Sequence, residues 1–299
     1  MENRQPLNED ALIRRLTRHL RLSSRVRVGV GDDCAVLRHT RNTSLLFKTD
    51  AVVSGRHFLL SAPAWKVGWK VLCRNISDVA AMGGRPTVAV VSLLVPQTLS
   101  SAYLKGLYKG LEKAARRFSV CIAGGDTSSA DNLAVVVALL GEVENRRLVL
   151  RSGALAGDRI FVTGRVGGSL GGKHLTFTPR VAEAEWLTAH YKPSAMMDLS
   201  DGLAADLPRL AKASGLSYRI AFENIPVTPG CSLREALAEG EDYELLLTMP
   251  KKKASNLRAS WEKVFPRLPL TDIGEMVSPQ VKPTPLPHGF DHFRDKFGR

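Results

Sequence analysis

Apolar residues in the first half of the chain recur with the spacings of helices and strands in turn. Helical spacing predicts a helix at residues 8–20, with Asn8 as its candidate cap, and longer helices at 65–82 and 100–118. The Gly-Gly-Arg-Pro run at 83–86 is a stop signal for the second of these helices. Runs of β-branched and apolar residues predict strands at residues 26–30, 44–49, 51–53, 87–95, 120–123 and 133–143.

The second half repeats this alternation after a polar, turn-rich joint at residues 151–158. We place a domain boundary just before the joint, which predicts an N-terminal domain at 1–149 and a C-terminal domain at 150–299. The connections are too irregular for a simple doubly wound sheet, so the predicted class is α/β (α+β) with two domains. The predicted strands are 159–163, 218–222 and 243–248, and the predicted helices are 203–214, 232–238 and 251–264.

Composition narrows the class of protein without indicating a function. Apolar residues at 44% and charged residues at 24% are ordinary for a soluble globular protein. The polar N-terminus lacks the apolar core of a signal peptide, and the longest apolar runs are too short to cross a bilayer. We therefore expect a cytoplasmic protein with no membrane partner. The four cysteines show no Cys-x-x-Cys spacing, which favours neither a zinc site nor a disulfide framework.

The charge pattern does point to chemistry, because carboxylates are scarce in a chain of net charge +13 and yet gather beside small residues. Almost no lysine or arginine lies next to them in the sequence, so they favour an external cation. Hard oxygen ligands of this kind suit Mg²⁺, which usually also holds substrate phosphates. The pattern indicates a Mg²⁺-dependent enzyme acting on phosphates. The segments are Gly31-Asp-Asp33, Thr49-Asp50, Ser77-Asp78, Gly124-Gly-Asp126, Asp198-Leu-Ser-Asp201 and Gly240-Glu-Asp242.

Taken singly, these acidic segments differ in how strongly they indicate function. Asp78 lies in an otherwise apolar helical stretch, where a buried carboxylate is costly unless it is paired or binds a metal. Residues 124–129 combine two glycines, which allow a ligand to approach the backbone, with Asp126 and three hydroxyls. The other segments are equally compatible with turns or a helix cap. No P-loop is present, and the glycine-rich loop at 164–172 is either a phosphate contact or a flexible connector.

Seven motifs in order and register resemble those of one family, thiamine-monophosphate kinase, within the AIR synthetase-like superfamily. The resemblance covers nearly the whole chain. Two of the motifs, Gly240-Glu-Asp-Tyr-Glu-Leu245 and Gly289-Phe-Asp-His-Phe293, separate this family from its relatives. The others are Gly31-Asp-Asp-Cys-Ala-Val-Leu37, Thr49-Asp50 with His57-Phe58, Asn75-Ile-Ser-Asp-Val-Ala-Ala-Met-Gly83, Gly124-Gly-Asp-Thr127 and Met197-Asp-Leu-Ser-Asp-Gly-Leu203.

The resemblance implies a two-domain AIR synthetase-like fold in which the N-terminal sheets of two subunits pair into a barrel, so a homodimer is expected. It implies ATP-dependent phosphorylation of thiamine monophosphate to thiamine diphosphate, with Mg²⁺ as the cofactor. The implied metal ligands are Asp33, Thr49, Asp50, Asp78, Asp126, Asp198 and Asp201, of which Asp50, Asp78 and Asp126 are expected to act in catalysis. The implied ATP contacts are Tyr108, Gly125, Asp126, Arg151 and Ser200, and the implied thiamine phosphate contacts are His57, Glu241 and Phe290.

Two positions depart from the family pattern. Lys48 stands where a serine or threonine is common, and Ser54 stands where an acid is common. In an extended strand Lys48 shares a face with Asp50, two residues later. Its ammonium group therefore either approaches the metal ligands or leans into solvent, and the sequence leaves both arrangements open.

Other functions also stay open from the sequence alone. AIR synthetase and selenophosphate synthetase belong to the same superfamily and would use similar aspartates. Against selenophosphate synthetase, the N-terminus shows no reactive cysteine followed by a glycine-rich segment. The basic charge also allows a nucleic-acid-binding protein. Lysine and arginine are spread over both halves, however, and only Lys251-Lys252-Lys253 cluster, so we expect no nucleic-acid partner.

Overall fold

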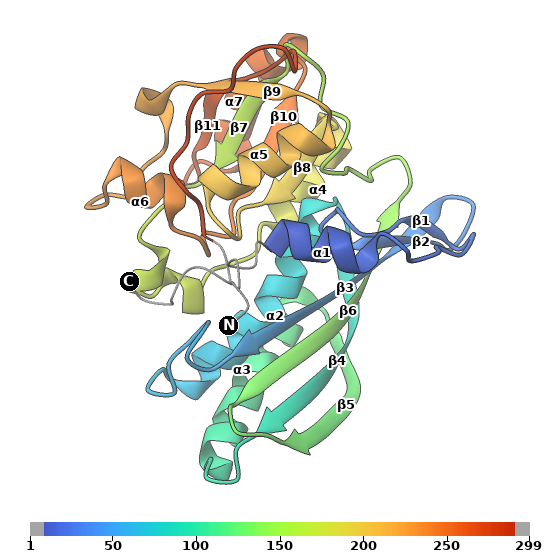
Figure 1. Ribbon diagram of the computed structural model, residues 1–299, viewed down its shortest axis with the longest axis vertical. Coiled ribbons are helices and arrows are strands. Elements are labelled where there is room, and N and C mark those ends of the chain that lie inside the picture. Colours follow the sequence, from blue (N-terminus) through green and yellow to red (C-terminus); the bar gives the residue numbers. More distant parts are fainter. Residues whose placement is uncertain (1–8, 291–299) are drawn as a thin grey trace, which may run out of the picture.

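The computed structural model describes residues 9–290, and these form two β-sheets with helices packed against each (Figure 1). The candidate cap Asn8 and the last three residues of the Gly289–Phe293 motif lie outside the described residues. The first sheet has six strands in the order β1-β2-β3-β6-β4-β5, and the second has five in the order β8-β10-β7-β11-β9. No helix within residues 9–290 is long and apolar enough to span a bilayer.

The first sheet is antiparallel except at its edge, where β4 and β5 run parallel. Its long central strands alternate buried and more exposed residues, as expected for a sheet with one face on a core. Its strands are β1 (Val26–Val28), β2 (Ala35–Arg38), β3 (Thr43–Val53), β4 (Arg85–Val95), β5 (Cys121–Ser129) and β6 (Ala134–Glu144).

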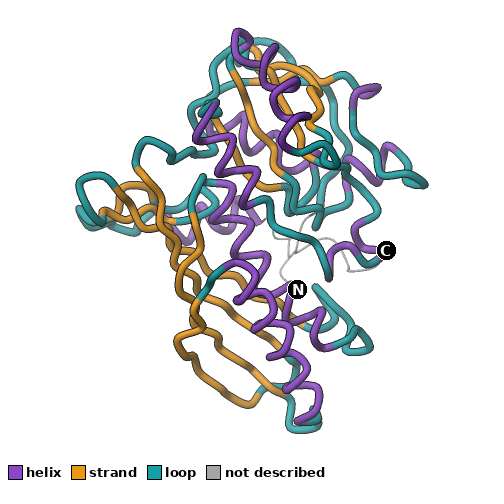
Figure 2. The backbone as a smooth tube through the Cα atoms, turned by 180° about the vertical axis from the view of Figure 1, so that it is seen from behind, coloured by secondary structure: helices purple, strands orange, loops and turns teal. Residues whose placement is uncertain are grey.

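Two long helices, α2 (Ala64–Ala81) and α3 (Ser101–Phe118), lie along one side of the first sheet (Figure 2). They approach each other closely through two glycines. A Cβ atom at Gly68 would lie 1.9 Å from the Leu107 carbonyl oxygen, and one at Gly110 would lie 1.9 Å from the Trp65 carbonyl oxygen. Any larger residue at either position would force the two helix backbones apart.

No helix within the described residues covers the other side of this sheet (Figure 1). That side exposes large apolar residues from β3 and β4, the two strands that flank β6, with Phe47 46%, Val88 36% and Val90 43% exposed. An apolar sheet face of this kind is characteristic of an interaction surface. We call it the helix-free face.

The second sheet is antiparallel throughout and is covered on both faces. Leu203, Leu207 and Leu210 belong to a core on one face, while Leu187 and Trp261 belong to a core on the other. Its strands are β7 (Arg159–Thr163), β8 (Ala195–Asp198), β9 (Ser217–Ile220), β10 (Leu245–Met249) and β11 (Leu270–Val277). The helices of this half are α4 (Val181–His190), α5 (Leu203–Ala213), α6 (Leu233–Ala238) and α7 (Lys251–Val264), with 3₁₀ turns at Ser169–Gly171, Lys173–Leu175 and Phe222–Asn224.

The two halves meet along α2, which contacts strands of the first sheet as well as β8 and α4 of the second half. The first helix, α1 (Glu9–Thr17), also reaches the second half, since Asp10 forms an ion pair with Arg209 at 3.6 Å. Residues at the C-terminal end of α2 are therefore placed between the sheets. The acidic motifs of both halves are brought together there.

Candidate functional site

One face of α2 carries four polar residues into the space between the halves. Lys70, Arg74, Ser77 and Asp78 are all buried, and their spacing places them on one side of the helix. The sequence pattern found Ser77 and Asp78 but missed the two cations. Lys70 and Arg74 could have been found in the same way, because they also lie in the apolar stretch and share helical spacing with Ser77 and Asp78.

Three buried aspartates from separate elements converge on this face of α2. Asp33 follows β1, Asp78 lies on α2, and Asp198 ends β8. One carboxylate oxygen from each lies within 4.8 Å of the other two, close enough to bind a single metal ion. The Ser77 hydroxyl donates a hydrogen bond of 2.6 Å to Asp198 Oδ2 and so orients that carboxylate. The structure thus unites three of the expected metal ligands from both halves of the chain.

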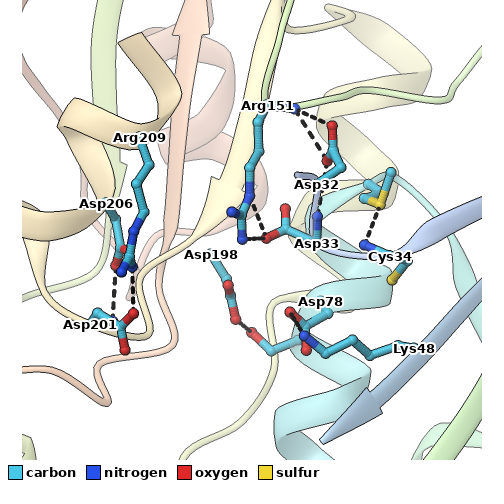
Figure 3. Close-up of polar contacts among 12 residues, drawn as sticks. Asp32, Asp33, Cys34, Lys48, Asp78, Arg151, Asp198, Asp201, Asp206 and Arg209 are labelled. Carbon is cyan, nitrogen blue, oxygen red and sulfur yellow. Dashed lines mark hydrogen bonds and ion pairs between the residues drawn. The ribbon is translucent and has the colours of Figure 1, made fainter. Parts of the chain in front are cut away.

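Lys48 and Arg74 extend the cluster to Asp50 on β3. The Lys48 ammonium lies 3.0 Å from Asp78 Oδ1 and 3.6 Å from Asp50 Oδ1, and Arg74 Nε lies 3.6 Å from Asp50 Oδ2. Figure 3 shows the Lys48 side chain running from the strand towards Asp78 on the helix. Lys48 therefore approaches the cluster and does not lean into solvent.

Arg151 anchors the other side of the cluster from the segment between the sheets. Its Nε and Nη2 donate to Asp33 Oδ1 at 3.0 and 2.5 Å, and its backbone N–H donates to the carboxylate of Asp32 (Figure 3). Only one oxygen of Asp33 is used. The other, Asp33 Oδ2, is buried and has no hydrogen-bond partner, which is costly for a carboxylate unless a ligand completes it.

The electrostatics of the cluster also favour a bound cation. Burial, together with the charge of Asp33, raises the pKa of Asp198 to about 7, although the Ser77 hydrogen bond opposes the shift. Burial raises the pKa of Asp78 well above its usual value, although Lys48 opposes the shift. A divalent ion would favour the ionised form of both groups. Buried carboxylates with an unsatisfied oxygen are hard ligands, and this donor set fits Mg²⁺.

Asp201 lies outside this cluster, in a second group beside it. Its carboxylate is paired with Arg209, which also contacts the buried Asp206 at 3.0 Å (Figure 3). The carbonyl oxygen of Asp201 accepts a hydrogen bond of 3.2 Å from the Phe290 N–H, and that of Ser200 accepts one of 2.7 Å from the Glu241 N–H. These expected nucleotide, metal and substrate residues therefore lie together on three adjacent loops.

His57 and Glu241, two of the expected substrate contacts, are joined by the buried Lys70. The Lys70 ammonium donates to the His57 carbonyl oxygen at 2.7 Å and forms an ion pair with Glu241. Burial lowers the pKa of Lys70 to about 8, although Glu241 opposes the shift. Glu241 also has a positive φ of 68°, a conformation that non-glycine residues adopt at a cost and that is common at functional sites.

Asp126 and Gly125 lie away from the aspartate cluster, on the edge strand β5. The predicted strand at 120–123 was too short, since β5 continues through the Gly124-Gly-Asp126 motif to Ser129. Together with Tyr108 they line an open pocket of about 510 Å³. A Cβ atom at Gly125 would lie 1.7 Å from the carbonyl oxygen of Val91, so this position requires glycine.

The strand register measures how far Asp126 lies from β3. Asp126 pairs with Ser92 of β4, Ser92 with Val136 of β6, and Val136 with Ala51 of β3. Three strand spacings correspond to about 14 Å. Ser92 and Asp126 also lie on the helix-free face, because their position alternates with buried residues of β4. Within one chain, Asp126 therefore does not share a metal ion with the cluster.

Thr49 belongs to this same helix-free face. It is exposed on β3, between Lys48 and Asp50, whose side chains turn towards α2. The expected metal ligands are therefore divided between the two faces of the first sheet.

Comparisons with known proteins agree with this geometry. The family model for AIR synthase related protein, N-terminal domain, matches residues 31–143. A thiamine-monophosphate kinase of Bacillus subtilis is 34% identical over 299 residues, covering 90% of this chain and 91% of that protein. One of Rhodopirellula baltica is 33% identical over 287 residues, covering 89% of this chain and 88% of that protein.

Solved structures show the same likeness. The structure described as AaThiL complexed with AMPPCP and TMP is 33% identical to this chain, with a TM-score of 0.84, covering 96% of this chain and 97% of that one. The hydrogenase maturation protein HypE of E. coli has a TM-score of 0.69 at 21% identity, covering 83% of this chain and 87% of that one. At that identity the second likeness concerns the fold alone.

Proposed function

The chain belongs to the thiamine-monophosphate kinase family, and we propose that it transfers the γ-phosphoryl group of ATP to thiamine monophosphate, giving thiamine diphosphate and ADP. The observation that carries this proposal is the convergence of Asp33, Asp78 and Asp198 from both halves of the chain, with one Asp33 oxygen buried and unsatisfied. We also propose that this reaction takes place in the cytoplasm.

The acceptor in this reaction is a phosphate oxygen that is already ionised at neutral pH, so no side chain has to act as a general base. The main obstacle is repulsion between a triphosphate and a monophosphate that must meet in line. Bound Mg²⁺ would neutralise these charges and orient the phosphates, held by Asp33, Asp78 and Asp198. The hydrogen bonds from Arg151 to Asp33 would hold the guanidinium group beside the phosphates, where it can donate a further hydrogen bond to one of them.

The chain's other residues have roles in binding and orientation. Tyr108 and Gly125 line the pocket proposed for the nucleotide. His57 and Glu241, held by Lys70, lie on the side proposed for thiamine phosphate. Phe290 would present an aromatic face to the cationic thiazolium or to the pyrimidine.

A homodimer completes the proposal, because Asp126 and Thr49 lie on the helix-free face, away from the aspartate cluster. In a barrel of two such sheets, the edge strand β5 of one copy would lie beside the opposite end of the sheet in the other copy. Asp126 of one subunit would then approach Thr49 of the second. The exposed Phe47, Val88 and Val90 supply the apolar surface such packing needs.

The direct test is an ATP-consumption assay of the purified protein with Mg²⁺ and thiamine monophosphate, with thiamine, or with no acceptor. The proposal expects ADP and thiamine diphosphate, identified by mass, only with thiamine monophosphate. ATP consumption without an acceptor, or with thiamine alone, would contradict it.

A further inference from the structure

Lys48 is the one lysine in direct contact with the aspartate cluster among the residues that the structure describes. Its Nζ lies 3.0 Å from Asp78 and 3.6 Å from Asp50, and its side chain is 20% exposed. It thus bridges two carboxylates that face each other from β3 and α2. A divalent ion bound by both carboxylates would lie in this same position.

The charges around Lys48 show what this contact does. The Lys48 ammonium faces two carboxylates, and a lysine amine is protonated at neutral pH because its usual pKa is about 10.4. Arg74 and Arg151 already pair with Asp50 and Asp33. With Lys48 included, fixed cations contact every carboxylate of the extended cluster except Asp198. Less negative charge is therefore left for metal ions than the number of aspartates suggests.

We infer that the Lys48 ammonium replaces one divalent cation between Asp50 and Asp78, so that this enzyme binds one Mg²⁺ fewer than a variant with a hydroxyl at position 48. The inference rests on the proposed function for its setting. Its physical basis is separate, because a fixed positive charge repels a divalent ion and also occupies the carboxylate oxygens that would bind it.

The test counts bound ions and does not depend on turnover. Free Mn²⁺ is titrated by electron paramagnetic resonance against the full-length protein with a saturating non-hydrolysable ATP analogue. The parent is compared with Lys48→Ser, which removes the charge and adds an oxygen ligand, and with Lys48→Met, which only removes the charge. Lys48→Arg keeps the charge, and Lys252→Ser removes one from an exposed position on α7.

The inference expects Lys48→Ser to bind one additional Mn²⁺ per chain. It expects Lys48→Met to bind its weakest Mn²⁺ about tenfold more tightly or better, because one like charge within 4–6 Å is removed. Lys48→Arg and Lys252→Ser should match the parent. Equal numbers and affinities in all five proteins would overturn the inference.

For variants that fold poorly, thermal unfolding measured in EDTA and in Mn²⁺ provides a second test of the inference. A Lys48→Met protein that folds only when Mn²⁺ is present supports the inference, since the ion then supplies the missing charge. If neither Lys48→Met nor Lys48→Ser folds with or without Mn²⁺, Lys48 is a structural counter-charge and the inference is wrong. An additional ion in Lys48→Ser together with an inactive parent would leave the inference standing and refute the proposed function.

Discussion

At the scale of single residues, buried charges identify the site more sharply than the acidic motifs do. Lys70 is fully buried and Arg74 nearly so, on a helix whose apolar residues pack into a core. Buried cations persist where carboxylates compensate them, and here the partners are Glu241 and Asp50. The partners lie 171 residues from Lys70 and 24 from Arg74 along the chain, so only the folded structure reveals them.

Phe290 belongs to this scale as the proposed aromatic contact of thiamine phosphate. Phe290→Ala should weaken binding of thiamine monophosphate roughly tenfold, because stacking over a cationic ring contributes on the order of 1–2 kcal/mol when desolvated. Binding of the ATP analogue should change little. Calorimetric titration with each ligand measures both, with Phe222→Ala as a control at another partly exposed phenylalanine, 37% exposed. Equal losses for the two ligands would assign Phe290 to docking of the chain end instead.

At the scale of elements, the glycine-rich loop 164–172 shows what the Gly240–Leu245 motif does. The Gly167 N–H donates to both oxygens of Asp242 at 3.1 Å, and the Ser169 hydroxyl donates to Asp242 Oδ1 at 2.6 Å. Glu244 forms a forked ion pair with Arg180 at 2.7 and 2.6 Å. The motif therefore holds this loop and the start of α4 in place. The loop is anchored, so it is not the flexible connector that the sequence left open as one interpretation.

The pH dependence of stability tests the burial of the Asp242 carboxyl group within this anchor. Burial raises the pKa of Asp242 to about 6 from a usual value of 3.8, although Lys173 and the hydrogen bonds oppose the shift. The folded state therefore binds this proton more tightly than the unfolded state does. The resulting contribution to the free energy of unfolding is fully present below about pH 3.8 and is lost as the pH rises through about 6. Relative to Asp242→Asn, the parent should lose on the order of 2 kcal/mol of unfolding free energy between about pH 4.5 and 7.

Urea unfolding of the two proteins at both pH values gives this difference. Asp131→Asn, at an exposed loop position, serves as the control and should follow the parent. If the parent instead gains unfolding free energy relative to Asp242→Asn as the pH rises, the pKa of Asp242 is not raised in the folded state and the prediction is wrong.

The elements themselves were predicted well where the apolar spacing is long and regular. Helices α2, α3, α5, α6 and α7 were predicted within about one residue of each end. The prediction of separate strands at 44–49 and 51–53 was wrong, since β3 is continuous, and β2, α4, β8 and β11 were missed. β8 has four residues, all buried, and so shows no alternation. The domain boundary proposed between 149 and 150 falls between the last strand of the first sheet and the first of the second.

At the scale of the whole molecule, Asp126 and Asp78 test whether the site is shared between subunits. Asp126→Asn and Asp78→Asn should each fold and each be inactive. Unfolded and refolded together, they form mixed dimers in which one site combines two unaltered halves. Such a mixture should regain about one quarter of the parental activity, because half of the dimers are mixed and each has one intact site.

Circular dichroism and thermal unfolding confirm that each variant folds, and each variant refolded alone is the control. A site contained within one chain predicts no recovery, since every chain in the mixture carries one of the two substitutions. That outcome would refute the shared site.

The helix-free face is also tested directly. Val90→Glu places a charge on the helix-free face, where packing against a second sheet would bury it at a large cost. Sedimentation should show a folded monomer with little kinase activity. Leu155→Glu, at an exposed loop position that is 65% exposed, should remain dimeric and active. A Val90→Glu protein that is still dimeric would place the interface elsewhere.

The sequence by itself determined the local order of this protein and the chemistry of its ligands. Apolar spacing specifies helices and strands because it depends on neighbouring residues, and carboxylates beside small residues indicate Mg²⁺ whatever their partners. Only the tertiary structure decided which carboxylates meet. Asp33, Asp78 and Asp198 come together through the contacts of α2 with both sheets, while the strand register sends Asp126 to the opposite face. The direction of Lys48 was decided in the same way, because a side chain's partner depends on the element packed against its strand.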